Sequence, residues 1–396
     1  MSEKKEIKKI LGNTLLEIAS AIETGSFGKS VKIGITTMGS EHGVENIVKG
    51  AELAAKTADF DIVLIGPKVD TELEIAEVNT VVEMHKKMEE LLDNGYLKAC
   101  VTMHYNFPIG VSTVGRVITP AKGKEMLIAT TTGTSATRRS EAMFKNALYG
   151  VATAKALGIK NPTVGILNLD NARSVERALT ELISKGYKMN VGESGRSDGG
   201  SVMRGNDLLM GTVDVMVTDS LTGNILMKMF SAFNTGGDYE ASGFGYGPGV
   251  GFDYHRCILI LSRASGVPVV AGAIQYAAQL AKGNFAKTLR DEFTKAKAVG
   301  FDEIASILNK EGSKSGIKAE TVEVVMPDKE VVTGTISGID IMDLDDACLA
   351  LWKAGIYAES GMGCTGPIVL VSEARIKAAN EVLSKAGYVS NTNNVC

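Results

Sequence analysis

One cysteine of the chain has a setting that could support acyl transfer. Cys364 lies in the stretch Glu-Ser-Gly-Met-Gly-Cys-Thr-Gly-Pro at residues 359–367, which has three glycines within six residues. Glycines leave the backbone unshielded and permit angles that other residues avoid, so we expect a thiol in an open loop. A thiolate is a good nucleophile and acyl carrier, and a helix N-terminus or a nearby cation lowers a thiol's pKa. Position alone favours the opposite interpretation, because a free cysteine is usually a small buried hydrophobic residue.

The chain that must position this thiol alternates short apolar segments with amphipathic ones. Such alternation predicts an α/β fold, with an open, mostly parallel sheet and helices on both faces. The expected strands are 31–36, 61–65, 99–104, 126–129, 163–167, 213–217, 257–261, 321–326 and 368–371. The expected helices include 44–56, 80–93, 141–157, 174–185, 223–233 and 373–386.

We expect three parts along the 396 residues: an N-terminal helix within 1–30, an α/β region at 31–310, and a C-terminal segment at 311–396 that carries the Cys364 loop. The glycine-rich stretch 234–251 interrupts the alternation. It predicts a long flexible loop, which would serve as a lid, a ligand cradle or a mere connector.

Polar loops follow several of the expected strands, where open α/β sheets bind their ligands. The first loop holds Ser40 and His42. Amides at the start of the following helix could bind an anion, and His42 could exchange a proton. His42 could equally be an ordinary surface residue near the helix cap.

The second loop, residues 130–140, is rich in hydroxyl groups and contains two adjacent arginines. These features suit recognition of phosphate or carboxylate, although neighbouring arginines rarely face one ligand together and could be solvated residues at a helix entry. The candidate ligand-binding residues of this loop are Thr132, Gly133, Thr134, Arg138 and Arg139.

Two further loops contribute Arg196 and the group Asp219, Gly223 and Asn224. Asp219 follows a buried strand, and Gly223 and Asn224 open a helix. They could fix a ligand or simply cap the helix, which Asp and Asn do well.

Composition and motifs exclude several classes of function. The net charge is −4, with 42 basic and 46 acidic residues in no like-charge block, so neither nucleic acid nor a membrane is an expected partner. The N-terminus lacks the apolar core of a signal peptide, which predicts a cytoplasmic protein. Neither the five cysteines nor the four histidines have metal-ligand spacing. A P-loop and a Rossmann fingerprint are missing, so no nucleotide or other cofactor is expected.

Four of these segments together resemble the phosphate acyltransferases of phospholipid synthesis, over roughly residues 30–285. They are 31–43, 61–66, 158–168 and 211–228, and the third ends at Asn168, which joins the candidate phosphate- and acyl-binding residues. That family makes acyl phosphates from acyl thioesters and inorganic phosphate. The resemblance implies the open α/β architecture of phosphotransacetylases and isocitrate- or isopropylmalate-type dehydrogenases. In place of that family's Asn- and Asp-bearing loop, this chain has Thr-Ser-Ala-Thr-Arg-Arg at 134–139.

The segments 343–348, 351–357 and 361–367 resemble the alpha subunits of component C of glycine/sarcosine/betaine reductase complexes. The resemblance covers essentially the whole chain and implies a role in anaerobic amino-acid fermentation. A carboxymethyl group on selenoprotein component A is converted there to acetyl phosphate, with the component C beta subunit as partner and Cys364 as the candidate acetyl carrier. Two alternatives stay open: a free-standing phosphate acyltransferase that uses acyl carrier protein or coenzyme A, and a non-catalytic scaffold subunit.

Overall fold

The structure is a computed structural model, and it describes residue 19 and residues 31–195, 200–311, 326–337, 339, 343–363 and 366–389. The helix expected within residues 1–30 lies outside these ranges, apart from residue 19, which is helical.

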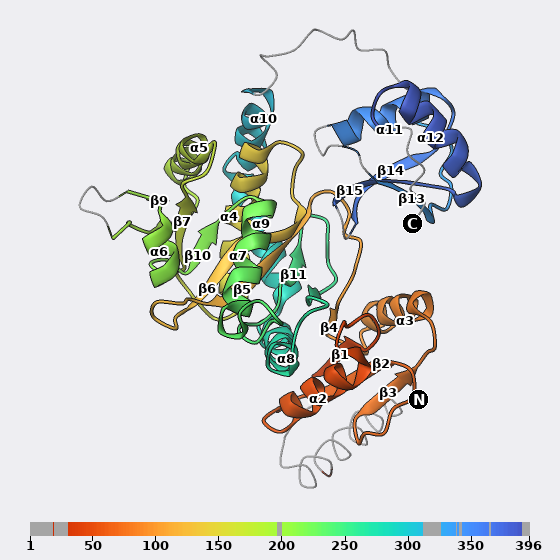
Figure 1. Cartoon of the computed structure of the whole chain (residues 1–396). Helices are drawn as coiled ribbons and strands as arrows, with labels where there is room; N and C mark the ends of the chain where they lie inside the picture. Colours follow the sequence, from red (N-terminus) through yellow and green to blue (C-terminus); the bar gives the residue numbers. More distant parts are fainter. Residues whose placement is uncertain are drawn as a thin grey trace, which may run out of the picture.

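One mixed sheet forms the centre of the unit built from residues 31–311 (Figure 1). Its strand order is β3-β2-β1-β4-β12-β11-β5-β6-β10-β7-β8, and β9 pairs with β7. The strands are β1 Lys32–Thr36, β2 Asp61–Gly66, β3 Glu74–Glu77, β4 Ala99–Thr102, β5 Val111–Ile118, β6 Glu125–Thr134, β7 Thr163–Leu167, β8 Asn190–Val191, β9 Val202–Met203, β10 Val215–Val217, β11 Gly247–Val250 and β12 Ile258–Ile260.

The two halves of this sheet run in opposite directions. Strands β1, β4 and β12 are mutually parallel, as are β6, β10 and β7, while β11 and β5 join the halves through three successive antiparallel pairings. The carboxyl ends of β1, β4 and β12 therefore lie at one edge of the sheet, and those of β6, β10 and β7 lie at the other. Strand-end loops of the two halves cannot all meet at one edge.

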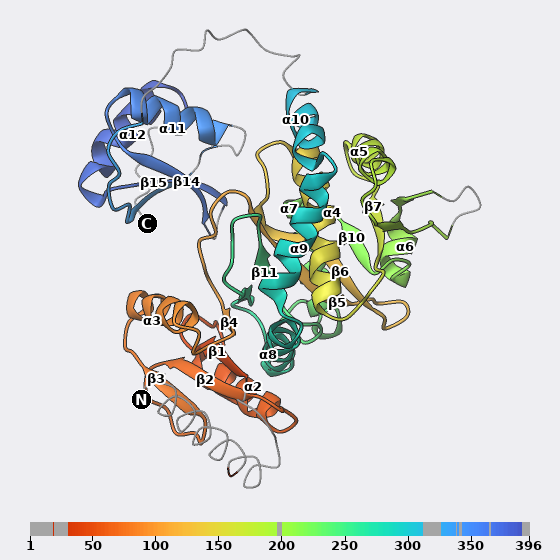
Figure 2. The ribbon, with the colours of Figure 1, turned by 180° about the vertical axis from the view of Figure 1, so that it is seen from behind.

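Helices cover both faces, as the sequence predicts (Figures 1 and 2). One face packs against α2, α4 and α8 in a core that includes Ile47, Phe144 and Ile274. On the opposite face α3 packs on the first half, while α6 and α7 pack on the second. The helices of this unit are α2 Gly43–Ala55, α3 Val81–Asp93, α4 Arg139–Ala156, α5 Ala172–Ser184, α6 Gly205–Met210, α7 Ser220–Ala232, α8 Val267–Lys282, α9 Phe285–Ala298 and α10 Phe301–Glu311. The predicted fold class is confirmed.

The glycine-rich stretch 234–251 contains a central strand, so the prediction of one long flexible loop is wrong there. Residues 247–250 form β11, which is buried and pairs with both β12 and β5. Glycine is required because neighbouring groups leave no room: a Cβ on Gly247 would lie 1.8 Å from the carbonyl oxygen of Val114, and one on Gly249 would lie 2.4 Å from the Phe107 ring. Because two of the four residues of β11 are glycines, the strand lacks the alternating apolar side chains that would have predicted it.

A separate antiparallel sheet, in the order β13-β15-β14, forms the C-terminal unit. Its own apolar core includes Leu344, Leu351, Val369 and Leu383. Cys348 belongs to this core: it is 5% exposed, and burial raises its pKa to about 12. The elements are β13 Gly334–Ser337, α11 Leu344–Lys353, β14 Ala358–Gly363, β15 Gly366–Val371, the 3-10 turn η4 Glu373–Arg375 and α12 Ile376–Lys385.

A search of the described helices finds none with the length and apolar character needed to cross a bilayer.

Candidate functional site

The end of β6 and the loops after β6 and β10 come together and bring eight of the predicted residues to one edge of the sheet. We call this group the β6–β10 cluster: Thr132, Gly133, Thr134, Arg138, Arg139, Asp219, Gly223 and Asn224. The pairing of Val215–Val217 with Leu127–Ala129 sets the two strand ends side by side, and α4 and α7 start directly after them.

Two glycines of the cluster allow close backbone approach. Gly133 has φ +76°, and a Cβ there would lie 2.6 Å from the carbonyl oxygen of Val111. A Cβ on Gly223 would lie 1.7 Å from the carbonyl oxygen of Thr130. Asn224 continues this contact, because its Nδ2 donates to the carbonyl oxygen of Thr131 at 3.1 Å. Gly223 and Asn224 thus dock the first turn of α7 against β6.

Asn146 on α4 holds the strand ends together, and it was not among the residues predicted from the sequence. This buried side chain donates to the carbonyl oxygen of Thr218 at 3.1 Å. Its Oδ1 accepts from the hydroxyl groups of Ser112, at 3.0 Å, and Ser135, at 2.7 Å. It lies mid-helix, where the pattern predicts only packing, so the only available signal was a polar residue on an otherwise apolar face.

The two adjacent arginines have different surroundings. Arg139, whose side chain is about half exposed, has Nη1 3.4 Å from Asp170 and Nε 3.8 Å from Asp219. Asp219 also caps α7, because its Oδ1 accepts from the amide of Thr222 at 2.8 Å. Arg138 is half-buried at the N-cap of α4, and no hydrogen bond or ion pair of its guanidinium group is found among the described residues. Arg138 therefore has donors to offer a ligand, whereas Arg139 already faces two carboxylates.

Thr134 also has unused bonding capacity. Its hydroxyl oxygen is buried and finds no hydrogen-bond partner within the described part of the chain. Buried hydroxyl groups usually have a partner, so an orphaned one needs an explanation. The 18-residue helix α4 begins five residues later with no side chain capping its first amides. Such a helix start carries a partial positive charge and free N–H groups, which suit an anion.

Two predicted residues lie beside or beyond this cluster. Asn168 follows β7, is exposed, and donates its backbone amide to the carbonyl oxygen of Met203 at 2.8 Å. Asp170, which pairs with Arg139, is two residues further along. Arg196 lies outside the described residues.

The hairpin that carries Cys364 docks next to the β6–β10 cluster. Strands β14 and β15 pair up to Gly363 and Gly366, so the glycines predicted to form an open loop belong to paired strands. Gly361 forms an antiparallel bridge with Pro108, and the amide of Gly110 donates to the carbonyl oxygen of Thr134 at 2.8 Å. Both ribbon views show the hairpin beside the segment that leads into β5 (Figures 1 and 2). Cys364 itself lies outside the described residues.

Ser40 and His42 belong to a different group, at the opposite edge of the sheet. The Ser40 hydroxyl accepts from the amide of His42 at 3.1 Å, and Nε2 of His42 lies 3.3 Å from the carbonyl oxygen of Ala264. The Arg263 side chain donates to the carbonyl oxygen of Gly39 at 3.1 Å. These contacts tie the loop after β1 to the loop after β12, so Ser40 and His42 hold the loop in place. No described contact joins them to the β6–β10 cluster.

Two histidines that were not among the predicted site residues lie close together at the same edge of the sheet as Ser40 and His42. His104 follows β4, and its ring centroid is 6.2 Å from that of His85 on α3. Burial lowers the pKa of both rings, and for His104 the charge of Arg263 lowers it further. Both imidazoles are therefore neutral near pH 7. His104 is the last residue of the predicted strand 99–104, and its position at a strand end was a signal that could have identified it.

A buried polar chain connects the two edges. The Tyr246 hydroxyl donates to Glu240, which also accepts from the hydroxyl of Ser265 beside the His42 loop. The carbonyl oxygen of Tyr246 accepts from the Thr131 hydroxyl at 2.7 Å, next to Asn224. Burial raises the pKa of Glu240. The β6–β10 cluster and the group of Ser40 and His42 are thus separate, and a chain of buried hydrogen bonds connects them.

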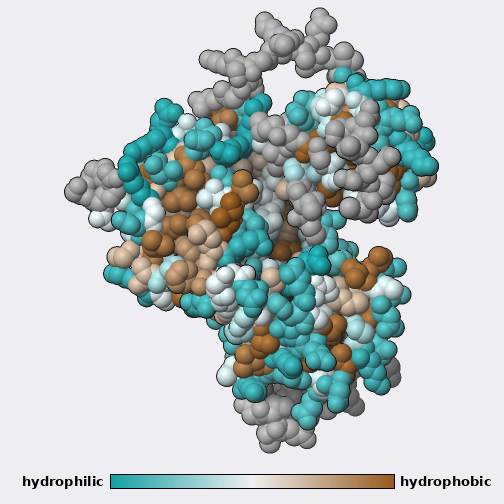
Figure 3. All heavy atoms as spheres, viewed as in Figure 1, coloured by the Kyte–Doolittle hydropathy of each residue, from teal (hydrophilic) through white to brown (hydrophobic). Residues whose placement is uncertain are grey.

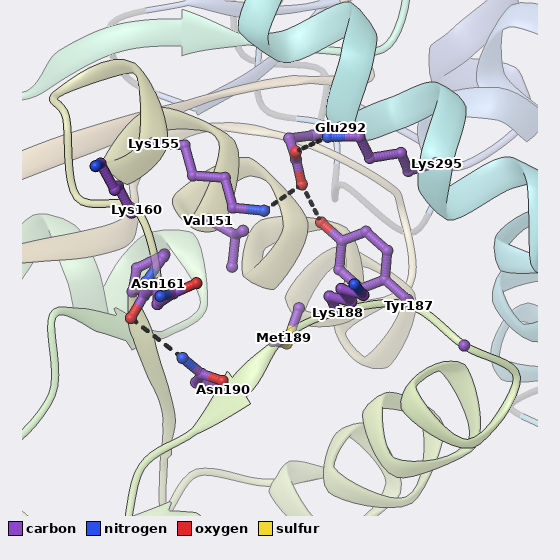
Figure 4. A pocket seen from close by; sticks show the side chains of 12 residues that line it. Val151, Lys155, Lys160, Asn161, Tyr187, Lys188, Met189, Asn190, Glu292 and Lys295 are labelled. Carbon is purple, nitrogen blue, oxygen red and sulfur yellow. Dashed lines mark hydrogen bonds and ion pairs between the residues drawn. The ribbon is translucent and has the colours of Figure 1, made fainter.

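A lysine-lined pocket of about 430 Å³ contains none of the predicted residues (Figure 4). It lies at the amino ends of β7 and β8, and the buried Glu292 is one of its lining residues. Burial alone would raise the pKa of Glu292, but hydrogen bonds from Lys155, Lys295 and Tyr187 bring it below the ordinary value. This carboxylate is fully paired, and it ties α9 to α4 and to the segment before β8.

Comparison with known proteins identifies the family of this chain. A family model described as "Fatty acid synthesis protein" matches residues 31–370. The chain belongs to this family. One member of the comparison, the "Glycine/sarcosine/betaine reductase complex component C subunit alpha" of Peptoclostridium acidaminophilum, is 67% identical over 386 residues, which cover 97% of this chain and all of that protein.

More distant relatives carry the name "Phosphate acyltransferase". Those of Thermotoga neapolitana and Thermotoga maritima are each 31% identical, over 50% of this chain and 68% of their own length. Both resemblances that the sequence motifs indicated are therefore confirmed. The residues 31–370 that match the fatty acid synthesis protein family include the whole β6–β10 cluster, strand β14, and β15 except for its last residue.

Proposed function

We propose that this chain is the alpha subunit of component C of a glycine/sarcosine/betaine reductase complex, and that it forms acetyl phosphate from an acetyl thioester and inorganic phosphate. Its partners would be the component C beta subunit and selenoprotein component A, which supplies the carboxymethyl group. The relative that is 67% identical and matched over its full length supports the assignment, and the phosphate acyltransferase relatives support the reaction type.

In this proposal the acetyl group is carried as a thioester on Cys364 or on a cysteine of the beta subunit. A phosphate oxygen attacks the thioester carbonyl, the tetrahedral intermediate collapses, and the thiolate leaves as acetyl phosphate forms. Placing phosphate beside the thioester makes the reaction effectively unimolecular, which is where most of the acceleration would arise. Backbone amides near the developing oxyanion would lower the barrier further.

The observation that carries the phosphate half of the proposal is the unused bonding capacity of the β6–β10 cluster. Within the described residues, the Arg138 guanidinium group and the buried Thr134 hydroxyl have no partner, and no side chain caps the first amides of α4. Charge-assisted bonds from arginine are a common way to hold phosphate. The bridge from Pro108 to Gly361 keeps the Cys364-bearing hairpin at this same edge.

The test is reconstitution of the complex with Cys364→Ala or Cys364→Ser and measurement of acetyl phosphate formed from glycine. We expect both variants to lose this product, because neither a methyl group nor a hydroxyl group at position 364 can form the thioester. Ser360→Ala on the half-buried strand β14 is the matched control and should retain activity. Full activity of the Cys364 variants would remove the thiol from the mechanism.

A free-standing phosphate acyltransferase is the second candidate, favoured by the relatives that bear that name. It predicts that the isolated chain makes acyl phosphate from coenzyme A or acyl-carrier thioesters and phosphate, without a partner. Acetyl phosphate production that requires the beta subunit would exclude it. A complex that keeps its activity with both the Cys364 and Arg138 variants would instead indicate a scaffold.

A further inference from the structure

The pocket beside Glu292 carries more positive than negative charge. Four lysines line it, Lys155, Lys160, Lys188 and Lys295, and they come from α4, α9 and the segments that lead into β7 and β8. Glu292 is the only carboxylate among the lining residues, all of which the structure describes. The lining side chains therefore have an excess of three positive charges, and the element that this pocket attracts from solution is an anion.

Two of these lysines share the single carboxylate. Nζ of Lys155 lies 2.6 Å from Glu292, and Nζ of Lys295 lies 2.7 Å from it. Figure 4 shows both side chains and Tyr187 reaching Glu292 from different elements. The Lys155 side chain is only 21% exposed, and one carboxylate cannot neutralise two ammonium groups. A cation that is mostly removed from water is stabilised by a counter-charge, so a second anion is favoured here.

Bonding capacity remains on all four ammonium groups. Each has three N–H donors, and the hydrogen bonds found in the described part of the chain use one donor of Lys155 and one of Lys295. Lys160 and Lys188 are exposed, and neither ammonium group has an ion pair or hydrogen bond with a described residue. Their two segments lead into the paired strands β7 and β8, so both lysines lie at the same end of the sheet.

We propose that this pocket binds a small organic molecule with at least two negative charges, carried by phosphate or carboxylate groups. Its volume of about 430 Å³ is within the range of small-molecule sites, about 300–1,000 Å³. Lysine ammonium groups bind both kinds of anion as point charges. Val151, Pro162 and Met189 supply apolar contacts for the body of the molecule.

The pocket differs in character from the apolar surface of the molecule. Exposed apolar side chains such as Leu221 and Phe233 belong to the α7 region, where hydrophobic residues gather in Figure 3. The pocket instead has charged groups that converge on a hollow from several elements. Charge therefore decides which molecule the pocket recognises, and its apolar residues add contact area.

Balancing the dipole of α4 is the structural alternative for these lysines. Lys155 lies in the last turn of α4, and the C-terminal end of a helix carries about half a negative elementary charge. That partial charge offsets only a fraction of the excess of three. Lys160 and Lys188 lie beyond the end of the helix, where the effect of the dipole falls off. The dipole accounts for Lys155 and leaves the other lysines available for a ligand.

The pocket is separate from the β6–β10 cluster. It lies at the amino ends of β7 and β8, whereas the cluster lies at the carboxyl ends of β6 and β10, which run parallel to β7. Helix α4 connects the two, because Arg138 is its N-cap and Lys155 lies in its last turn, about 27 Å away along 18 residues. The proposal therefore does not depend on the proposed function, and variants can distinguish an anion in the pocket from phosphate at the cluster.

The experiment is isothermal titration of the full-length chain at low ionic strength with two probes in turn, pyrophosphate and citrate. We expect the wild type to bind at least one of them with a Kd below about 1 mM. The double variant Lys160→Gln, Lys188→Gln should weaken that binding by at least about tenfold, because it removes two charges that face the anion. Both residues are exposed, so circular dichroism should show unchanged folding.

Two further variants make the result specific to the pocket. The double variant Lys49→Gln, Lys86→Gln removes the same charge from exposed sites on α2 and α3 and should bind as the wild type does. Arg138→Gln, at the other end of α4, should also retain the binding.

The probes and variants together decide the proposal. Binding of pyrophosphate alone would identify a phosphorylated ligand, and binding of citrate alone would identify a carboxylate. Failure of the wild type to bind either probe below about 1 mM would overturn the proposal. Equal weakening in the Lys49 and Lys86 control would overturn it too, since general surface charge would then attract the anion. Loss of binding in Arg138→Gln but not in the pocket variant would place the anion at the β6–β10 cluster instead.

Discussion

The two adjacent arginines of the β6–β10 cluster offer a sharp test of where phosphate binds. They share a side-chain type and are neighbours in sequence, yet Arg138 has no described partner and Arg139 faces Asp170 and Asp219. If phosphate binds at the start of α4, Arg138 is the arginine whose N–H groups are available to donate hydrogen bonds to it. Replacing each in turn with glutamine removes the charge and keeps much of the side-chain volume.

The size of the effect follows from these surroundings. A hydrogen bond between charged groups contributes about 1.5–3 kcal/mol, so Arg138→Gln should raise KM for phosphate by about 10- to 150-fold. Arg139 is half exposed, and surface ion pairs contribute about 0–1 kcal/mol, so Arg139→Gln should change this KM by less than about fivefold.

The assay is the rate of acetyl phosphate formation at varied phosphate, with the thioester substrate held at saturation. A binding role predicts a change in KM for phosphate, while KM for the thioester stays constant. Equal effects of the two substitutions would refute the reasoning, since it depends on their different pairing. A larger effect for Arg139 would move the phosphate site toward Asp219 and α7.

Two further predictions concern stability. Gly223→Ala places a Cβ 1.7 Å from the backbone of Thr130, so it should lower the free energy of unfolding by about 1–3 kcal/mol or more in urea denaturation. Gly205→Ala, with nothing within 4 Å of its Cβ, should leave stability nearly unchanged, and equal losses would contradict the contact. His85 and His104 have pKa values lowered by burial, so the unfolded chain takes up protons first as the pH falls below about 6.5. Stability should be complete above that pH and fall below it, and replacing both histidines with glutamine should flatten the fall measured by denaturation at pH 7.5 and 5.5.

The sequence predicted those strands and helices in which buried apolar side chains recur at a regular spacing. Strands such as Asp61–Gly66 and helices such as Arg139–Ala156 were expected within a few residues of their observed ends. Strand β11 was missed because Gly247 and Gly249 have no side chains to show a pattern, and the space around them is filled by Val114 and Phe107. Only the sheet pairing reveals such a strand.

The candidate site was predicted in part for a different reason. Arg138, Thr134 and Asp219 were identified because polar and charged residues follow predicted strands. Which of these loops meet, however, is decided by the direction of each strand in the sheet. The antiparallel strands β11 and β5 reverse the second half of the sheet and separate His42 from the β6–β10 cluster. Periodicity does not encode that reversal. The eight residues of the β6–β10 cluster and the two residues at the other edge, Ser40 and His42, therefore looked alike in the sequence.

The structure also separates residues that build the cluster from residues that have capacity left for a ligand. Gly223 is needed for close approach to β6, Asn224 bonds the Thr131 backbone, and Asp219 caps α7. Each is satisfied without a ligand, so the motif shared with the phosphate acyltransferases specifies the shape of the strand ends. In the proposed function, the anion would be held by atoms that have no partner among the described residues. In this cluster those are the Thr134 hydroxyl, the Arg138 guanidinium group and the first amides of α4. Substitutions in the first set should therefore reduce stability and activity together, whereas Arg138→Gln should reduce phosphate affinity in a chain that melts at the wild-type temperature.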